Sequence, residues 1–168
     1  MNAEIESRFN KLEERRQALV ARVRALSPEK QQAKPSPKEF SPAEVLMHFF
    51  LAEDSNVAFL RKTPPSSLKG KTPKMTFIFR KTVASMEQPT KAIATVGYMI
   101  PKGTTNVDEA DQKWATSRAD LKGFLEKVEN PKDPFCKFLF FFGLASADDY
   151  LRLMESHMTY HEARFPTS

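Results

Sequence analysis

Apolar side chains recur at helical spacing in four separate stretches of the chain. Residues 3–26 form the first stretch, in which Arg16 is the one break in an apolar face made of Ile5, Phe9, Leu12, Leu19, Val23 and Leu26. Acidic residues in its first turn and arginines in its last turn suit the helix dipole. The pattern predicts a long amphipathic helix, which Ser27-Pro28 ends, followed by a connector over residues 31–40.

The second stretch begins with a strong start signal for a helix. Ser41 and Glu44 have the spacing of a capping box, and Pro42 occupies the first helical position. Residues 45–60 are apolar on most sides, so we expect this helix to be buried. Prolines at the end of residues 63–65 terminate it.

Two further stretches complete the helical pattern. Residues 107–128 carry an apolar stripe that includes Trp114 and is interrupted by Arg118. The last helix begins at the capping sequence of residues 146–149. Its apolar stripe consists of Ala147, Tyr150, Leu151, Met154, His157, Met158, His161 and Phe165. Four main helices with no repeat and no convincing sheet predict an all-α four-helix bundle.

Residues 64–106, between the second and third main helices, are the hardest part to interpret. Residues 75–86 could form a short helix or a strand, and residues 92–100 have the β-branched character of a strand. We expect a long irregular connection whose short local structure packs over one end of the bundle. Residues 135–143 are a hydrophobic link that could include a short turn of helix.

The net charge is +5, and its distribution is uneven. Between Ser55 and Lys102 the only acidic residue is Glu87, while nine residues there are basic. A solvated surface is the commoner meaning of such a run, and an electropositive rim that attracts an anionic small molecule is the alternative. The chain has no nucleic-acid-binding motif, so we expect no nucleic-acid partner.

Composition and length favour a single cytoplasmic domain over residues 1–168. The single cysteine, Cys136, excludes an internal disulfide and is expected to be a buried, unreactive side chain. The first residues are charged and lack an apolar signal region, and the longest apolar run, residues 138–144, is too short to cross a membrane. We therefore expect no membrane partner.

The chain contains three histidines, and their positions suggest a shared metal site. His157 and His161 are four residues apart, so their Cβ atoms should lie about 6 Å apart on one helix face. By itself such a pair is weak evidence, because many are surface residues. Both lie on the apolar stripe, however, where an unpartnered imidazole costs about 1–3 kcal/mol. A metal ion would satisfy both rings.

His48 lies in the second helix, where a lone histidine is more often a core residue than a ligand. Its face also carries small side chains such as Ala52, which leaves room for a pocket. A third nitrogen from this helix would complete a site with open coordination positions, as catalytic rather than structural metal sites have. No catalytic residue can be assigned from the sequence.

Short motifs in a specific order carry a resemblance to a known family. The sequence of residues 41–48, a third helix with a tryptophan, residues 134–150 and the run from His157 to His161 together resemble the DinB-like (YfiT-type) superfamily. The resemblance covers most of the chain. Two positions depart from the family's usual pattern, namely Phe40 in place of tryptophan and Arg164 in place of glutamine.

The resemblance implies an up-down-down-up bundle in which His48, His157 and His161 hold a divalent metal, most readily zinc or nickel. It also implies homodimers, and transfer chemistry that uses a low-molecular-weight thiol such as bacillithiol or mycothiol. Our leading hypothesis is a metal-dependent thiol S-transferase or hydrolase acting on a small-molecule substrate. The alternatives are a non-catalytic metal-binding or stress-associated bundle, and a helical interaction protein whose histidines are incidental.

Four further residues are candidates for the site. Arg118 could face the pocket and clamp a substrate carboxylate, although a side chain that reaches solvent is the commoner outcome. Trp114 could contact substrate but is more simply explained as core. Glu44 and Asp111 are candidate fourth or supporting ligands, and spacing alone does not decide between these roles.

Overall fold

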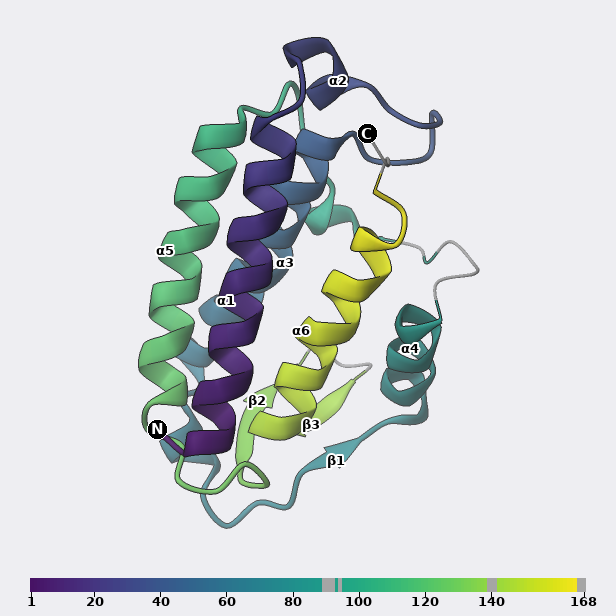
Figure 1. The fold of residues 1–168 in the computed structure, drawn as a ribbon. Coiled ribbons are helices and arrows are strands. Elements are labelled where there is room, and N and C mark those ends of the chain that lie inside the picture. The colour runs from purple at the N-terminus through teal and green to yellow at the C-terminus, as the bar shows by residue number, and fades with distance from the viewer. Residues whose placement is uncertain (89–92, 94, 139–141, 166–168) are drawn as a thin grey trace.

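Four long helices form a bundle in the computed structural model, which describes residues 1–88, 93, 95–138 and 142–165 (Figure 1). These helices are α1 (Ala3–Arg24), α3 (Pro42–Lys62), α5 (Val107–Leu125) and α6 (Ala147–Glu162). All four helices predicted from the sequence are confirmed. The colour gradient in Figure 1 shows that α1 and α6 run toward the upper end of the bundle, whereas α3 and α5 run toward the lower end.

Side chains cap the beginnings of the main helices, as the sequence predicts for α3 and α6. Ser41 Oγ accepts a hydrogen bond from the Glu44 backbone N–H at 3.2 Å, and the Glu44 carboxylate accepts one from the Ser41 N–H at 2.9 Å. Ser146 and Asp149 make the equivalent pair of bonds at the start of α6. These reciprocal bonds satisfy backbone donors that a helix N-terminus otherwise leaves unpaired.

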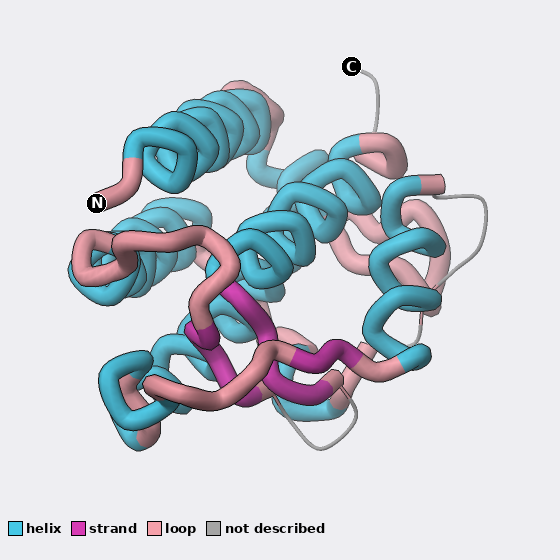
Figure 2. The backbone as a smooth tube through the Cα atoms, turned by 90° about the horizontal axis from the view of Figure 1, so that it is seen from below, coloured by secondary structure: helices cyan, strands magenta, loops and turns pink. Residues whose placement is uncertain are grey.

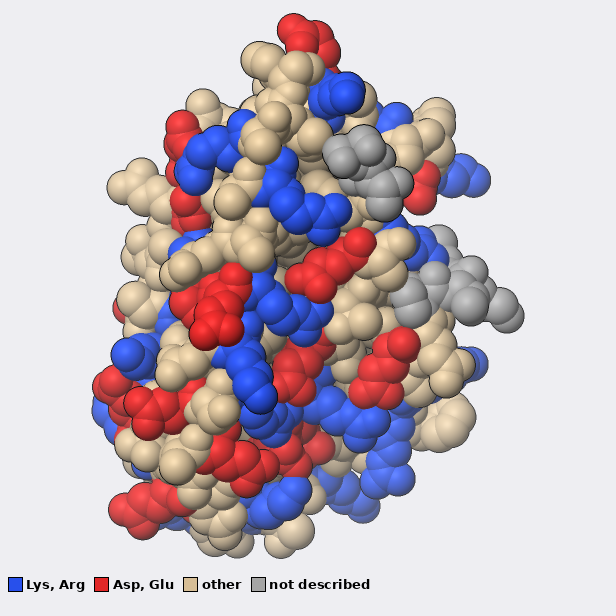
Figure 3. Space-filling view, in the orientation of Figure 1, with Lys and Arg blue, Asp and Glu red and all other residues tan. Residues whose placement is uncertain are grey.

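Ion pairs tie α1 to its two neighbours in the bundle. Arg8 pairs with Asp148 at 2.5 Å and with Glu155 at 2.8 Å, which links α1 to α6. Arg16, the residue that breaks the apolar stripe of α1, pairs with Asp111 on α5 and is buried. On the face drawn in Figure 3, basic and acidic side chains are accordingly interleaved and not separated into patches.

A small antiparallel sheet lies at the lower end of the bundle, seen from below in Figure 2. Its strands are β1 (Lys74–Met75), β2 (Pro134–Lys137) and β3 (Gly143–Ser146), in the order β1-β3-β2. The expectation of no sheet is therefore wrong. Of residues 135–143, for which a short turn of helix is possible from the sequence, residues 135–137 and 143 lie in strands, and residues 139–141 lie outside the described residues. Antiparallel pairing supplies the backbone hydrogen bonds that this short apolar link, packed against α6, could not make alone.

Gly143 permits the close approach of β1 to β3. Its φ is +95°, and a Cβ atom at this position would lie 2.3 Å from the Lys74 carbonyl oxygen. The side chain of an L-residue cannot occupy that space, so the close pairing of β1 with β3 depends on glycine at this position. Directly after β1, the Thr76 N–H donates to the Phe142 carbonyl oxygen at 3.0 Å, which leads the chain into α4.

The connection before α5 is more regular than the sequence suggests. In the stretch 75–86, for which the sequence allows helix or strand, Met75 belongs to β1 and residues 77–86 form most of α4 (Phe77–Glu87). This helix packs along α6 and not over the bundle end (Figure 1). Among the described residues of the stretch 92–100 there is no strand, only the 3-10 turn η2 (Gly97–Met99); residues 92 and 94 lie outside the described part. Short helical turns α2 (Pro28–Gln32) and η1 (Pro65–Leu68) complete the structure.

None of the helices in the described part of the chain combines the length and the apolar character needed to cross a membrane.

Candidate metal centre

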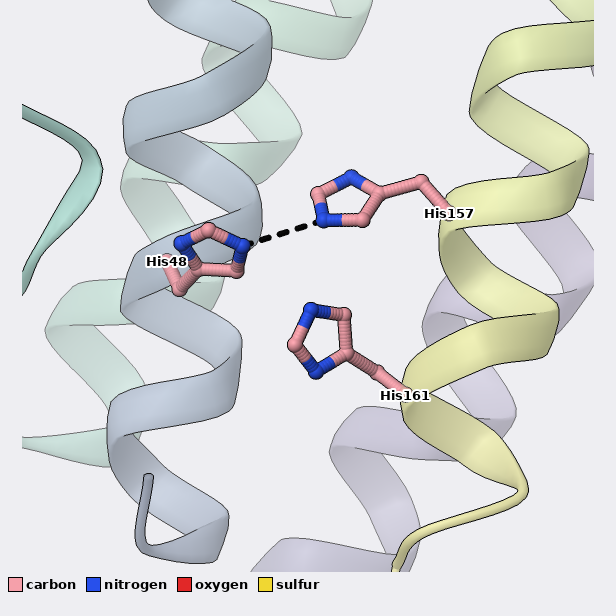
Figure 4. A group of neighbouring side chains, drawn as sticks. All are labelled: His48, His157 and His161. Atoms are coloured by element: carbon pink, nitrogen blue, oxygen red, sulfur yellow. Dashed lines mark hydrogen bonds between the residues drawn. The ribbon is translucent and has the colours of Figure 1, made fainter. Parts of the chain in front are cut away.

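The three histidines meet between α3 and α6 (Figure 4). His48 projects from α3, while His157 and His161 project from successive turns of α6 toward it. Their ring centroids are 4.9–5.0 Å apart, and one nitrogen from each ring lies within 4.8 Å of the other two. The predicted convergence of these side chains is therefore present in the fold.

Hydrogen bonds define the orientation of the His48 ring. Its Nδ1 lies 2.8 Å from the carbonyl oxygen of Met99 in η2. A carbonyl oxygen only accepts, so Nδ1 carries the proton and Nε2 keeps its lone pair. That Nε2 lies 3.0 Å from Nε2 of His157, which donates to it in this arrangement. The lone pair of His48 thus points into the space shared by the three rings.

Burial keeps all three imidazoles neutral. It lowers the pKa of His48, and it lowers the pKa of His157 well below its ordinary value, with further contributions from the charges that His161 and His48 would carry. The pKa of His161 is lowered to about 3. Burial is the largest cause, followed by the charge that His48 would carry and then by the positive charge of Arg164. Near pH 7 the site therefore presents neutral nitrogens, the form in which histidine binds metals.

The donor set fits a borderline metal ion such as Zn²⁺ or Ni²⁺. Within the described residues, His48, His157 and His161 are the one group of metal-binding side chains that lie close enough together. Three imidazoles leave coordination positions open, and such ions accept imidazole readily.

Aromatic side chains support the histidines from the core. The Phe49 ring makes edge contacts with His157 and His161, at centroid distances of 4.9 and 5.1 Å. The Trp114 ring stacks on the Phe49 ring at a centroid distance of 4.8 Å, and Trp114 is fully buried. Trp114 therefore contacts the site through Phe49, and it does not line the cavity beside the histidines.

A cavity of about 200 Å³ opens beside the three histidines, all of which line it. Most of its wall is apolar and comes from α3, α4, α6, the segment around η2, and the residues that follow β2 and precede β3. Glu53, Asn56 and Tyr160 are among its polar members. No described lysine or arginine lines it. The electropositive rim considered for residues 55–102 is therefore not part of this cavity's described wall.

Arg118 lies in the core and not at the surface. Only 2% of it is exposed, so the alternative in which it reaches solvent is wrong. Its guanidinium donates to both carboxylate oxygens of Glu53, and it does clamp a carboxylate, but one that belongs to the protein itself. Arg118 is thus one residue removed from the cavity, whose wall contains Glu53.

The other two acidic candidates are engaged elsewhere. Glu44 caps α3 and forms an ion pair with Lys34 at 2.8 Å. Asp111 pairs with Arg16 and Arg24 at the interface of α1 and α5. Cys136 is 1% exposed, and burial raises the pKa of its thiol to about 12, which confirms the expectation of a buried, unreactive cysteine.

Two contributors to the site were not identified from the sequence. The Met99 backbone carbonyl orients His48, and no side-chain signal could have revealed a backbone acceptor. Glu53 was not singled out, although a carboxylate within a helix that is apolar on most sides was a usable signal.

Comparison with known proteins agrees with this fold. A family model described as the DinB superfamily matches residues 11–163. No curated protein matches the chain. Among solved structures, the crystal structure of TT2238, a four-helix bundle protein, is similar, with 20% identity, a TM-score of 0.58 and coverage of 95% of this chain and 97% of that one. At that identity the likeness concerns the fold alone. Because the family model spans nearly all the described helices, the chain belongs to the DinB superfamily.

Proposed function

We propose that this protein is a divalent-metal-dependent enzyme in which His48, His157 and His161 hold the ion. The observation that carries the proposal is the convergence of three neutral imidazoles on one point of a cavity wall. Because three neutral nitrogens leave coordination positions open, the site suits exchangeable ligands more than a structural ion. Zinc or nickel is the proposed metal.

The proposed reaction is transfer of a low-molecular-weight thiol to an electrophilic small molecule, or hydrolysis of such a molecule. A bound divalent ion lowers the pKa of a thiol or water and so supplies a nucleophile near neutral pH. The Met99 carbonyl holds His48 in the tautomer that this role needs, and the mainly apolar wall of the cavity suits an uncharged substrate.

Arg118 and Trp114 are proposed to influence substrate binding through their neighbours. Arg118 holds the Glu53 carboxylate in the cavity wall, and Trp114 supports Phe49 behind the two histidines of α6. Both residues are fully buried, which favours this indirect role over direct contact with a substrate.

Metal analysis of protein purified without a histidine tag tests the proposal. We expect about one equivalent of zinc or nickel in the wild type and its loss in His157→Ala. Asn56→Ala, which alters the same cavity without removing a ligand, is the matched control and should retain the metal. An absence of stoichiometric metal in the wild type would contradict the metal site and, with it, the proposed chemistry.

A second candidate function is a metal-binding or stress-associated bundle without turnover. A conjugation assay with several cellular thiols and monochlorobimane separates the two candidates. Turnover that depends on both the metal and a thiol supports the transferase. Metal binding without conjugation of any thiol, and without hydrolysis of an ester tested in parallel, supports the non-catalytic protein.

We propose a single-domain homodimer of the cytoplasm, with the up-down-down-up order of the family and without nucleic-acid or membrane partners. The helix directions in Figure 1 support that order. Sedimentation equilibrium would test the dimer.

A further inference from the structure

A second, smaller cavity lies beside one of the three histidines, His161, and beside Tyr160. Its volume is about 100 Å³, and His161 and Tyr160 line both cavities. The charged residues of its wall are Lys38, from the segment before α3, Arg164, which follows α6, and Glu39. One of the three proposed ligands, His161, is thus shared by a mainly apolar cavity and by a cavity with two cationic side chains.

Arg164 lies close to the histidines. The central carbon of its guanidinium is 4.4 Å from the centre of the Tyr160 ring, and that ring lies 5.0 Å from the His161 ring. The backbone N–H of Arg164 also donates to the His161 carbonyl oxygen at 3.1 Å, which ties this residue to the last turn of α6. A guanidinium is therefore held about one ring away from a proposed ligand.

The balance of charge around the histidines favours an anion. Three neutral imidazoles leave both positive charges of a divalent ion uncompensated. Glu53, the acidic residue in the wall of the larger cavity, is paired with Arg118. Among the described residues that line the smaller cavity, there is one acidic residue, Glu39, and there are two basic residues, Lys38 and Arg164; Lys38 and Glu39 are both exposed. A bound divalent ion would add positive charge near the two basic side chains, and an anionic group placed between them and the ion would be attracted to both.

We propose that the smaller cavity is a subsite for the carboxylate group of the ligand that reaches the metal centre, with Arg164 and Lys38 as its cationic contacts. This inference rests on the proposed function, because the ligand's other end is taken to occupy an open position of the metal. A planar guanidinium presents paired N–H donors that match a carboxylate, while a lysine contributes a point charge.

The sizes of the two cavities suit different groups, with the carboxylate in the smaller cavity and the uncharged reaction partner in the larger one. A volume of about 100 Å³ is enough for a carboxylate with one or two carbon atoms, since a liquid water molecule takes about 30 Å³. The larger cavity, of about 200 Å³ and with a mainly apolar wall, suits the uncharged reaction partner. The inferred ligand class is therefore a short thiol that carries a carboxylate.

Binding of two matched thiols to the cobalt-loaded protein tests the subsite. The probes are 3-mercaptopropionate and its neutral amide, which have the same length and the same thiol. Thiolate binding to Co²⁺ is followed by the absorption band that it produces, so the readout is affinity and not turnover. We expect the carboxylate to bind at least about tenfold more tightly than the amide, the factor that corresponds to about 1.4 kcal/mol.

Variants identify the residues responsible. Arg164→Gln should reduce the preference for the carboxylate to less than about threefold, and Lys38→Gln, a change at an exposed position, should reduce it partly even if Arg164→Gln folds poorly. Arg61→Gln removes one positive charge at an exposed position outside both cavities and should leave the preference unchanged. Equal affinity for the two thiols in the wild type, or an unchanged preference in both Arg164→Gln and Lys38→Gln, would overturn the subsite while leaving the metal centre intact.

Failure of the metal site has a different signature. If no cobalt binds, the proposed function fails, and the subsite is then decided in the metal-free protein with propionate and propionamide followed by NMR. Shifts of the resonances of residues 161–164 with propionate alone support the subsite. Identical responses to the two compounds refute it.

Discussion

Arg118 and Glu53 form a bidentate ion pair inside the bundle, with Nε and Nη2 of Arg118 2.5 and 2.8 Å from the two carboxylate oxygens. The two residues are 2% and 4% exposed, and they join α5 to α3 behind the cavity. Each charge is tolerated there because the other compensates it. The pair therefore makes the core sensitive to the loss of one partner and less sensitive to the loss of both.

Arg118→Met should lower the free energy of unfolding by about 3–5 kcal/mol, because it leaves the Glu53 carboxylate buried without its partner. The double variant Glu53→Gln/Arg118→Met should be more stable than this single variant, as measured by urea denaturation. Arg61→Gln, which breaks the exposed pair with Asp120, is the control and should cost at most about 1 kcal/mol. A double variant less stable than Arg118→Met would refute the charge argument.

Glu44→Gln should leave the metal content unchanged and reduce stability by about 1 kcal/mol. The reason is that the Glu44 carboxylate completes the cap of α3 and pairs with Lys34, and does not reach the histidines. Metal analysis together with thermal denaturation checks both parts. A stable variant that had lost its metal would instead show that Glu44 is a ligand.

Acid should destabilise the metal-free protein through His161. Its folded pKa of about 3 lies below the value of about 6.5 expected in the unfolded chain, so above pH 6.5 the ring is neutral in both states. As the pH falls below 6.5, the unfolded chain binds a proton that the native state does not, and stability falls by at most about 1.4 kcal/mol per pH unit until the folded pKa is reached.

The variant His161→Gln tests this pH dependence. Urea denaturation between about pH 4 and pH 7 should give a shallower fall in stability for the variant than for the wild type, because one of the titrating groups is missing. The comparison is made without metal, since bound metal would compete with protons for the same nitrogen. Parallel curves would show that His161 is protonated equally in both states.

Gly143→Ala should destabilise the protein by more than about 2 kcal/mol. Its Cβ atom would lie 2.3 Å from the Lys74 carbonyl oxygen, and the backbone at this position has a φ of +95°. Gly123→Ala is the matched control, because Gly123 lies within α5 and a Cβ there meets nothing within 4 Å. Removing a helical glycine should stabilise the protein by about 0.5–1 kcal/mol. Equal effects of the two substitutions would show that β1 does not need to approach β3 closely.

The parts of the fold that sequence patterns predict correctly are those set by local interactions. The start of α3 depends on Ser41 and Glu44, which are only three residues apart. The capping box predicted from their spacing is confirmed by their hydrogen bonds. The shared face of His157 and His161 likewise follows from helix geometry alone. The prediction of His48 as their partner comes from the family resemblance and not from a local pattern, and the structure places its ring beside theirs in the space between α3 and α6 (Figure 4).

The parts that sequence patterns miss depend on distant partners. The sheet is built from short strands, and Lys74 pairs with Leu144 across a long separation in the chain. Arg118 is buried because Glu53, 65 residues away, accepts its hydrogen bonds. The pattern within one helix shows that a charged residue interrupts an apolar stripe. It does not show whether another helix supplies a side chain of opposite charge to pair with it.

The hydrogen bond between His48 and His157 joins positions 109 residues apart. During synthesis α3 leaves the ribosome long before α6, so an unfinished chain that ends before α6 carries just one of the three imidazoles. Three nitrogens are present together only after α6 has packed against the rest of the bundle. If the proposed site holds a metal, its full set of three ligands would therefore be available only in chains whose synthesis and assembly are complete.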